Sequence, residues 1–233
     1  MSKEKIIFVA IDTNSISRAK KIIKETRSSA NLRVIPKFGL QFFYAKKNRA
    51  FLEKLNTEFF LDVKISDTST TALGAMDSLK DIKKIRWITA HANGGYNMLK
   101  AINKKAKQIN KKISVLGVSI LTSLDSNSVR ELGYTKTIKQ LVLKQAGIIK
   151  KSGCKGIIAS AEESKIIKKK YKNLFVVTPG IRFPEDSKDD QKRVVTPRDA
   201  LVLGKADAIV IGRSLTRSNI KKNIQKLIDH LNK

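Results

Sequence analysis

The sequence has little of several features that mark common protein classes. Its 233 residues include one cysteine, Cys154, which excludes an internal disulfide framework and a multi-cysteine zinc site. No apolar run approaches the roughly 18–20 residues that span a bilayer. The first residues turn acidic and polar after a short distance, which is not the pattern of a secretory signal. These absences predict a soluble protein of a reducing cytoplasm.

Acidic and aromatic residues are also scarce. Asp and Glu total 20 against 48 Lys and Arg, which gives a net charge of +28. Such a balance is typical of nucleic-acid-binding proteins. However, lysine pairs recur from Lys20-Lys21 to Lys221-Lys222 instead of gathering on one element, and the aromatic residues that stack on single strands are only 6%. We therefore interpret the lysines as a solvated exterior that attracts anionic substrates, with neither nucleic acid nor membrane as partner.

Short apolar runs alternate with stretches of helical period along the whole chain. The runs are rich in Ile and Val and nearly continuous in apolarity, as strands buried on both faces should be. The predicted strands are 6–11, 32–38, 59–65, 85–91, 113–120, 156–160, 174–178 and 208–212. The predicted helices are 15–26, 41–55, 71–83, 95–110, 138–152, 161–170, 197–203 and 218–231.

Eight strands, each followed by a helix, indicate an α/β fold, the (β/α)8 TIM barrel, which takes about 250 residues. An open doubly wound sheet is the alternative, although it more often has about five to seven strands. No linker or shift in composition divides the chain, so residues 1–233 are expected to form a single barrel domain. In such barrels the chemistry lies at the C-terminal ends of the strands.

The third predicted strand acquires charges where a buried strand should have none. Asp62 and Lys64 are two positions apart, so their side chains should share the face that points into the barrel. Asp67 follows where the chain enters a loop. A buried ion pair that only fixes this loop is the structural interpretation. Because charges there cost several kcal/mol each unless paired, we favour a functional site, with Lys64 kept protonated as a proton donor.

Two neighbouring strand ends add further charges to this region. Asp12 ends the first strand and Lys37 ends the second, and either alone could cap a helix or lie in solvent. With Asp62, Lys64 and Asp67 they give alternating charges on three successive strand ends. The sequence therefore predicts one charged site at the top of the barrel.

Glycine and arginine recur late in the chain, where this fold often binds phosphate. Gly180 and Arg182 follow the seventh strand, and Gly212 and Arg213 follow the eighth. Glycine allows the backbone to approach a ligand, and arginine offers a bidentate donor. The polar loop 189–193 between the seventh strand and its helix is placed where a lid could close.

At this point the sequence resembles the orotidine 5′-phosphate decarboxylase family in its bacterial form, over nearly its whole length. The Asp-x-Lys-x-x-Asp core is shared by a wider superfamily, whereas Lys37 and the Asp-Gln-Lys-Arg string narrow the resemblance to this enzyme. The motifs that carry it are Ala10-Ile11-Asp12, Lys37-Phe38-Gly39-Leu40, Asp62 to Asp67, Leu121-Thr122-Ser123, Thr178 to Arg182, Asp190 to Val194 and Ile211-Gly212-Arg213.

The resemblance implies decarboxylation of orotidine monophosphate to uridine monophosphate in pyrimidine biosynthesis, with no cofactor and no metal. Lys64 resembles the catalytic acid, and Asp62 the carboxylate beside the scissile group. Lys37 resembles the residue that holds Asp62 and the ribose, and Asp12 the one that binds a ribose hydroxyl. The other implied substrate contacts are Thr122, Pro179 and the phosphate-binding set Arg182, Gln191, Gly212 and Arg213.

The resemblance also implies a homodimer. Asp67 and Thr71 match residues that complete the site of the partner subunit. The family usually reads Asp-Ile-Pro-Asn-Thr where this chain reads Asp67-Thr68-Ser69-Thr70-Thr71, and it usually has valine in place of Phe38. The first departure loosens the loop that carries Asp67 but removes no ionisable group. His91 matches a common histidine of the fourth strand, and we interpret it as structural.

Two other functions compete with this interpretation. A sugar-phosphate decarboxylase or aldolase of the same superfamily keeps the Asp-x-Lys-x-x-Asp core but needs Mg²⁺. Those enzymes generally place a carboxylate at the position of Lys37, so the lysine argues against a divalent cation. A nucleic-acid-binding barrel would explain the net charge but leaves the charges of the third strand unexplained.

Overall fold

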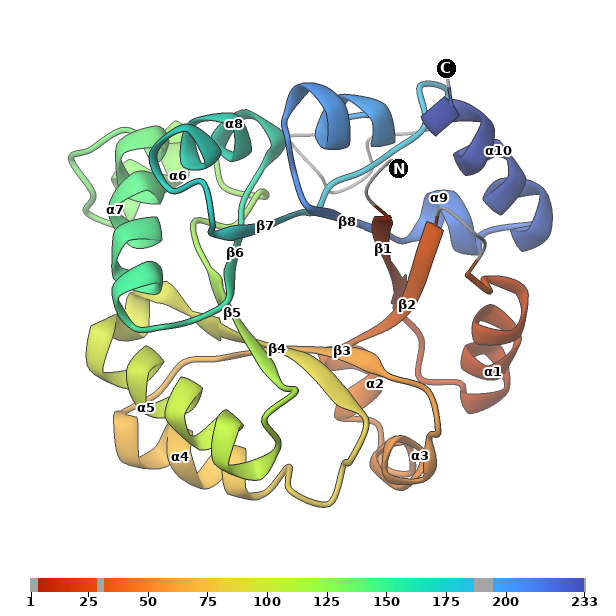
Figure 1. Cartoon of the computed structure of the whole chain (residues 1–233), viewed down its shortest axis with the longest axis horizontal. Helices are drawn as coiled ribbons and strands as arrows, with labels where there is room; N and C mark the ends of the chain where they lie inside the picture. Colours follow the sequence, from red (N-terminus) through yellow and green to blue (C-terminus); the bar gives the residue numbers. More distant parts are fainter. Residues whose placement is uncertain (1–3, 29–31, 187–194, 233) are drawn as a thin grey trace.

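Eight parallel strands follow one another in chain order around a closed barrel, and helices surround them (Figure 1). The computed structural model describes residues 4–28, 32–186 and 195–232. The last strand pairs with the first, so the sheet has no free edge in the part of the chain that is described. The strands are β1 (Lys5–Ile11), β2 (Leu32–Gly39), β3 (Phe59–Ile65), β4 (Ile85–His91), β5 (Ser114–Val118), β6 (Gly156–Ile158), β7 (Phe175–Thr178) and β8 (Ala208–Ile211).

The predicted TIM barrel is therefore confirmed, and each predicted strand is present. The helices and helical turns connect the strands along the outside of the ring. They are α1 (Ile16–Glu25), α2 (Leu40–Phe43), α3 (Asn48–Lys54), α4 (Ser69–Asp77), η1 (Ala92–Gly94), α5 (Gly95–Ile109), α6 (Ser126–Glu131), α7 (Ile138–Lys151), α8 (Ala161–Lys170), η2 (Asp199–Leu203), α9 (Arg213–Thr216) and α10 (Ile220–Asn232).

The helix predictions were wrong in two connections of the first half of the barrel. The single helix expected over 41–55 is two short ones, α2 and α3. The side chain of Asn48, the first residue of α3, is buried and donates to the carbonyl of Asn14 (3.0 Å), which holds the start of α3 against the loop after β1. The helix expected over 71–83 begins earlier, with Thr68 as its N-cap, and ends at Asp77. Beyond Asp77 the backbone bonds span three residues, as in Ile82 N–H to Leu79 O, so the chain forms turns.

Other departures are smaller and lie in the second half. The helix expected over 197–203 is largely the π-helix η2, and the short helices α6 and α9 were not predicted. The capping box predicted at Ser160 and Glu163 is confirmed, since each side chain bonds the backbone N–H of the other residue. Polar caps and apolar periods thus located most helix boundaries to within a few residues.

The core consists of two layers that explain the apolar strands. A smaller cluster fills the barrel interior, and a larger one lies between the strands and the helices. Inside the barrel, Phe8 meets Phe60 and Trp87 edge to face, with ring centroids 4.9 and 5.1 Å apart. This packed interior fills the barrel below the C-terminal ends of the strands, and the charged side chains lie at those ends. Within the described residues, no helix has the length and apolarity to cross a membrane.

Candidate active site

A pocket of about 270 Å³ opens at the C-terminal end of the barrel, directly above the packed interior. Its floor is apolar and includes Phe60, Val118, Ile158 and Val210. Nine of the twelve predicted site residues line it, although they are spread over more than 200 positions of the chain. They are Asp12, Lys37, Asp62, Lys64, Thr122, Pro179, Arg182, Gly212 and Arg213.

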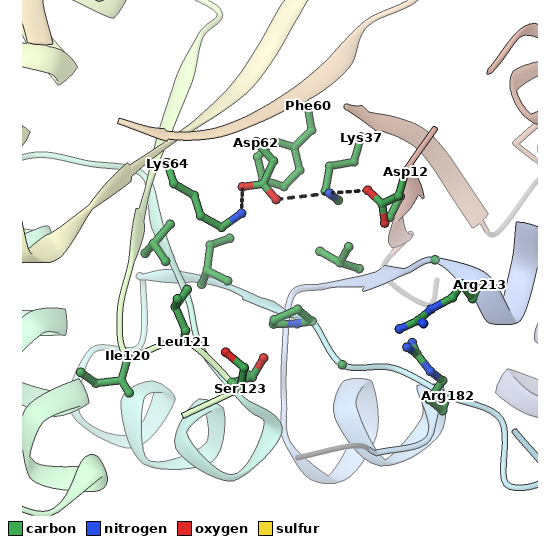
Figure 2. Close-up of a pocket in the computed structure, with 18 residues that line it drawn as sticks. Asp12, Lys37, Phe60, Asp62, Lys64, Ile120, Leu121, Ser123, Arg182 and Arg213 are labelled. Carbon is green, nitrogen blue, oxygen red and sulfur yellow. Dashed lines mark hydrogen bonds and ion pairs between the residues drawn. The ribbon is translucent and has the colours of Figure 1, made fainter. Parts of the chain in front are cut away.

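Four charged side chains form an alternating row along one wall of this pocket (Figure 2). The Lys37 ammonium lies between two carboxylates, 3.9 Å from Asp12 Oδ1 and 3.2 Å from Asp62 Oδ2. Lys64 Nζ donates to the other oxygen of Asp62 at 3.0 Å. Lys37 and Asp62 are nearly enclosed, whereas the side chain of Asp12 is 60% exposed. Two cations thus hold one buried carboxylate at the base of the pocket.

The ionisation of Asp62 depends on these neighbours. Burial alone opposes its charge, but the positive charges of Lys37 and Lys64 and hydrogen bonds from Lys64 and Thr89 outweigh that cost, so the pKa of Asp62 is lowered from 3.8. Asp62 therefore stays a carboxylate at neutral pH. A fixed negative charge at this position can orient a cation and repel another anion placed beside it.

The local backbone at Lys64 is less regular than strand alternation predicts. Lys64 has φ +50°, and the pairing of β3 with β4 shifts register between Leu61 and Ile65. Its N–H donates to Thr89 Oγ1 (2.8 Å), and the same hydroxyl donates to Asp62 Oδ1 (2.9 Å). The predicted meeting of Asp62 and Lys64 is confirmed, but it depends on a bulge that a hydroxyl from the next strand holds in place.

Thr89 is a residue that sequence reasoning missed. It is fully buried in β4 and connects the backbone of one charged residue to the side chain of another. The available signal was one hydroxyl between apolar neighbours, Ile88 and Ala90. Ser123 and Leu121, beside the predicted Thr122, also line the pocket and were not assigned to the site.

The predicted phosphate-binding residues Arg182 and Arg213 lie across the pocket from Lys64 (Figure 2). Figure 2 shows the guanidinium groups of Arg182 and Arg213, which come from the loops after β7 and β8. Gly180 has φ +76°, a conformation that side chains other than glycine rarely adopt, and it also lines the pocket. The predicted Gln191 and the predicted lid 189–193 lie outside the described residues.

Asp67 and Thr71 do not line the main pocket. They are exposed at the start of α4, beside a second depression that Lys64 also lines. Asp67 Oδ1 accepts from the N–H of Thr68 (2.7 Å), and among the described residues no ion pair joins it to Lys64. Among the residues that the structure describes, therefore, Lys64 has one carboxylate partner, Asp62, and the side chain of Asp67 is exposed.

His91 is the last residue of β4. Its side chain is half-buried, and its Nδ1 has no hydrogen-bond partner in the described part of the chain. Burial and the positive charge of Lys64 both lower the pKa of His91 from 6.5. The imidazole is therefore neutral at physiological pH and adds no positive charge beside Lys64.

Comparisons with known proteins show the family to which the chain belongs. The family described as "Orotidine 5'-phosphate decarboxylase / HUMPS family" matches residues 5–226. An orotidine 5′-phosphate decarboxylase of Carboxydothermus hydrogenoformans is 34% identical over 97% of this chain and 95% of its own length. One from Coxiella burnetii is 32% identical over 96% and 94%. The crystal structure of the Lactobacillus acidophilus enzyme superposes with a TM-score of 0.79 and 26% identity, covering 99% of this chain and 100% of that one.

Proposed function

Because the chain belongs to the orotidine 5′-phosphate decarboxylase / HUMPS family, we propose that it converts orotidine monophosphate to uridine monophosphate and CO2. The observation that carries this proposal is the row of Asp12, Lys37, Asp62 and Lys64 above an apolar floor. It places one proton-donating ammonium beside one fixed carboxylate. The reaction belongs to pyrimidine nucleotide synthesis, and we assign it to the cytoplasm, where a single buried thiol would stay reduced.

The chemical step follows from the charges around Lys64. When the bond between the ring carbon and the carboxyl group breaks, CO2 leaves and the electron pair stays on the ring carbon. The ammonium of Lys64 stabilises this developing anion and then transfers a proton to it, forming the C–H bond. Asp62 holds the ammonium in place at 3.0 Å. Its charge also opposes the substrate carboxylate, and that repulsion disappears as CO2 departs.

Lys37 supports a mechanism that uses no divalent cation. Its ammonium lies between Asp12 and Asp62, in the place where a metal ion would otherwise bridge two carboxylates. We therefore expect turnover to be unchanged in EDTA. Activity that disappears in the chelator and returns with Mg²⁺ would instead favour the sugar-phosphate decarboxylase or aldolase interpretation.

The phosphate of the substrate would bind on the opposite wall. Arg182, Gly212 and Arg213 line the pocket there, and the family resemblance adds Gln191, which lies outside the described residues. Contacts to this remote group supply binding energy that can be used for closing the site and excluding water from the row of charges. Thr122 and Pro179 line the space between the two walls.

We further propose that the active form is a homodimer in which Asp67 and Thr71 complete the partner's site. The exposure of Asp67, and its lack of an ion pair with Lys64 of its own chain, support this arrangement. Mixing the inactive variants Lys64→Ala and Asp67→Ala tests it. Random exchange of subunits should restore about a quarter of wild-type activity, since half of the dimers would carry one complete site. A mixture that stays inactive after exchange would contradict shared sites.

The central experiment is Lys64→Ala in a spectrophotometric assay that follows loss of orotidine monophosphate absorbance. We expect kcat to fall by several orders of magnitude while uridine monophosphate still binds, because the phosphate-binding wall is intact. Lys80→Ala, which removes an exposed lysine after α4, is the matched control and should behave as wild type. A Lys64→Ala enzyme with near-native kcat would exclude Lys64 as the acid.

A further inference from the structure

Another cavity, distinct from the depression beside Asp67, lies behind Arg182 and Arg213 of the main pocket. It has a volume of about 220 Å³, and Arg182 and Arg213 line it as they line the main pocket. The proposed decarboxylation makes no use of this space, which we call the outer cavity. Its other walls come from the loop after β7, from α9, from the turn between α9 and α10, and from the start of α10. The residues are Asp186, Ser214, Arg217, Ser218 and Asn223.

The outer cavity is lined by three arginines and one carboxylate. That carboxylate, Asp186, accepts the N–H of Phe183 (3.0 Å) and so closes a turn. Arg217 follows Arg213 by one helical turn, and its N–H donates to Arg213 O (3.0 Å), which places both side chains on the same side. Two guanidinium groups on one side of a turn can both donate to the same anion.

The turn that carries Arg217 is held from two sides. The Asn223 side chain donates to the carbonyls of Leu215 (3.1 Å) and Arg217 (2.7 Å). From α1, Arg18 donates to the carbonyl of Thr216. A guanidinium that extends from a fixed backbone loses less conformational entropy when it binds a ligand than one on a free loop.

Ser214 adds a hydroxyl that an anion could use. The residue is 8% exposed, and its Oγ has no hydrogen-bond partner within the described residues. A buried hydroxyl without a partner is uncommon because it forfeits its hydrogen bonds to water. Phosphoryl oxygens accept several hydrogen bonds and suit both this donor and the planar guanidinium groups.

We propose that the outer cavity is a subsite for a second phosphoryl group. A nucleoside 5′-diphosphate such as uridine diphosphate would place its first phosphoryl group at the position of the substrate phosphate and its second in the outer cavity. Because Arg182 and Arg213 line both cavities, the two positions are contiguous, as the groups of a pyrophosphate linkage must be. The inference rests on the proposed function, and it makes uridine diphosphate a competitive inhibitor of the decarboxylation.

The test compares inhibition by uridine diphosphate and by uridine monophosphate in EDTA, so that no metal complex forms. In Arg217→Gln we expect the inhibition constant for the diphosphate to rise about tenfold, the loss expected for one charge-assisted contact. The constant for the monophosphate and kcat/KM for the substrate should change less than about twofold. Lys221→Gln removes the same charge from an exposed position of α10 outside the cavity and should leave all three unchanged.

Two results would overturn the subsite. One is an equal effect of Arg217→Gln on both nucleotides, and the other is an equal effect of Arg217→Gln and Lys221→Gln. Calorimetric titration of inorganic phosphate into the protein saturated with uridine monophosphate shows which anion the outer cavity takes. If phosphate binds and Arg217→Gln abolishes the binding, the cavity takes a free phosphate. If phosphate does not bind, the cavity takes only a phosphoryl group that is linked to the nucleotide. A wild-type protein that binds uridine diphosphate through Arg217 but does not decarboxylate would refute the proposed function and leave the subsite standing.

Discussion

Replacing Thr89 with valine would test whether one buried hydroxyl organises the charged wall of the pocket. The hydroxyl accepts the N–H of Lys64 at 2.8 Å and donates to Asp62 Oδ1 at 2.9 Å, with no exposure to solvent. Valine keeps the shape of threonine but offers neither hydrogen bond. The substitution therefore leaves a backbone N–H and a carboxylate oxygen each without one partner.

The magnitude follows from these two losses. A hydrogen bond to a charged group contributes about 1.5–3 kcal/mol, and an unpaired buried N–H costs about 1–3 kcal/mol. Asp62 Oδ1 keeps its bond to Lys64 Nζ, and local relaxation recovers part of the cost, so we expect a net loss of about 2–4 kcal/mol in the free energy of unfolding. For a chain of this length that corresponds to roughly 4–16 °C in Tm.

Urea unfolding and the decarboxylation assay would be applied to Thr89→Val and Thr89→Ser together. Serine keeps the hydroxyl and loses one methyl group, so it should retain most of kcat and lose about 1 kcal/mol. We expect Thr89→Val to lower kcat more than it raises KM. The substitution removes the hydroxyl that holds Lys64 and Asp62 in position, and it leaves Arg182 and Arg213 on the opposite side of the pocket unchanged. If valine and serine variants match in stability and kcat, the reasoning about this hydroxyl is wrong.

Three further predictions concern the proposed phosphate contact Arg213, the carboxylate of Asp62 and the packing of the barrel at Gly156. Arg213→Ala should raise KM at least tenfold and lower kcat/KM, measured by steady-state kinetics, and an unchanged KM would contradict its assignment. Asp62→Asn should be less stable than wild type in urea titrations, by an amount that is constant above about pH 5 and shrinks below about pH 4. The lowered pKa of Asp62 stabilises the fold where the unfolded carboxyl is ionised, and this stabilisation is lost as the pH falls through the pKa of the folded state. A stability difference that shrinks near neutral pH would contradict this reasoning. Gly156→Ala should lower the free energy of unfolding by about 3 kcal/mol, because the new Cβ would meet the backbone oxygen of Phe175. Gly74→Ala, in an open helical position, should be neutral or stabilising by about 0.5–1 kcal/mol in the same unfolding assay. Equal effects of the two substitutions would refute the packing argument.

The sequence predicted the barrel because its strands are buried on both faces. Continuous apolar runs such as residues 6–11 indicate strands whatever their neighbours are, and their alternation with helical periods leaves few topologies. The same logic located the charges, because Asp62 and Lys64 stand out where only apolar residues are expected. One failure is the helix expected over 41–55, which is interrupted before Asn48. Asn48 begins α3 and bonds a residue 34 positions away, a contact that no local pattern reports.

By itself, then, the sequence determined the order of the elements and which residues are chemically out of place, since both depend on local pattern. Tertiary structure alone decided how those residues meet. Thr89 became part of the site because β4 lies against a bulge in β3, and Arg217 joined Arg182 and Arg213 because the turn after α9 is held by α1 and α10. A hydrogen bond acts over about 3 Å in space regardless of separation along the chain. Bonds between residues that are far apart in the sequence are therefore reported by no local period or motif.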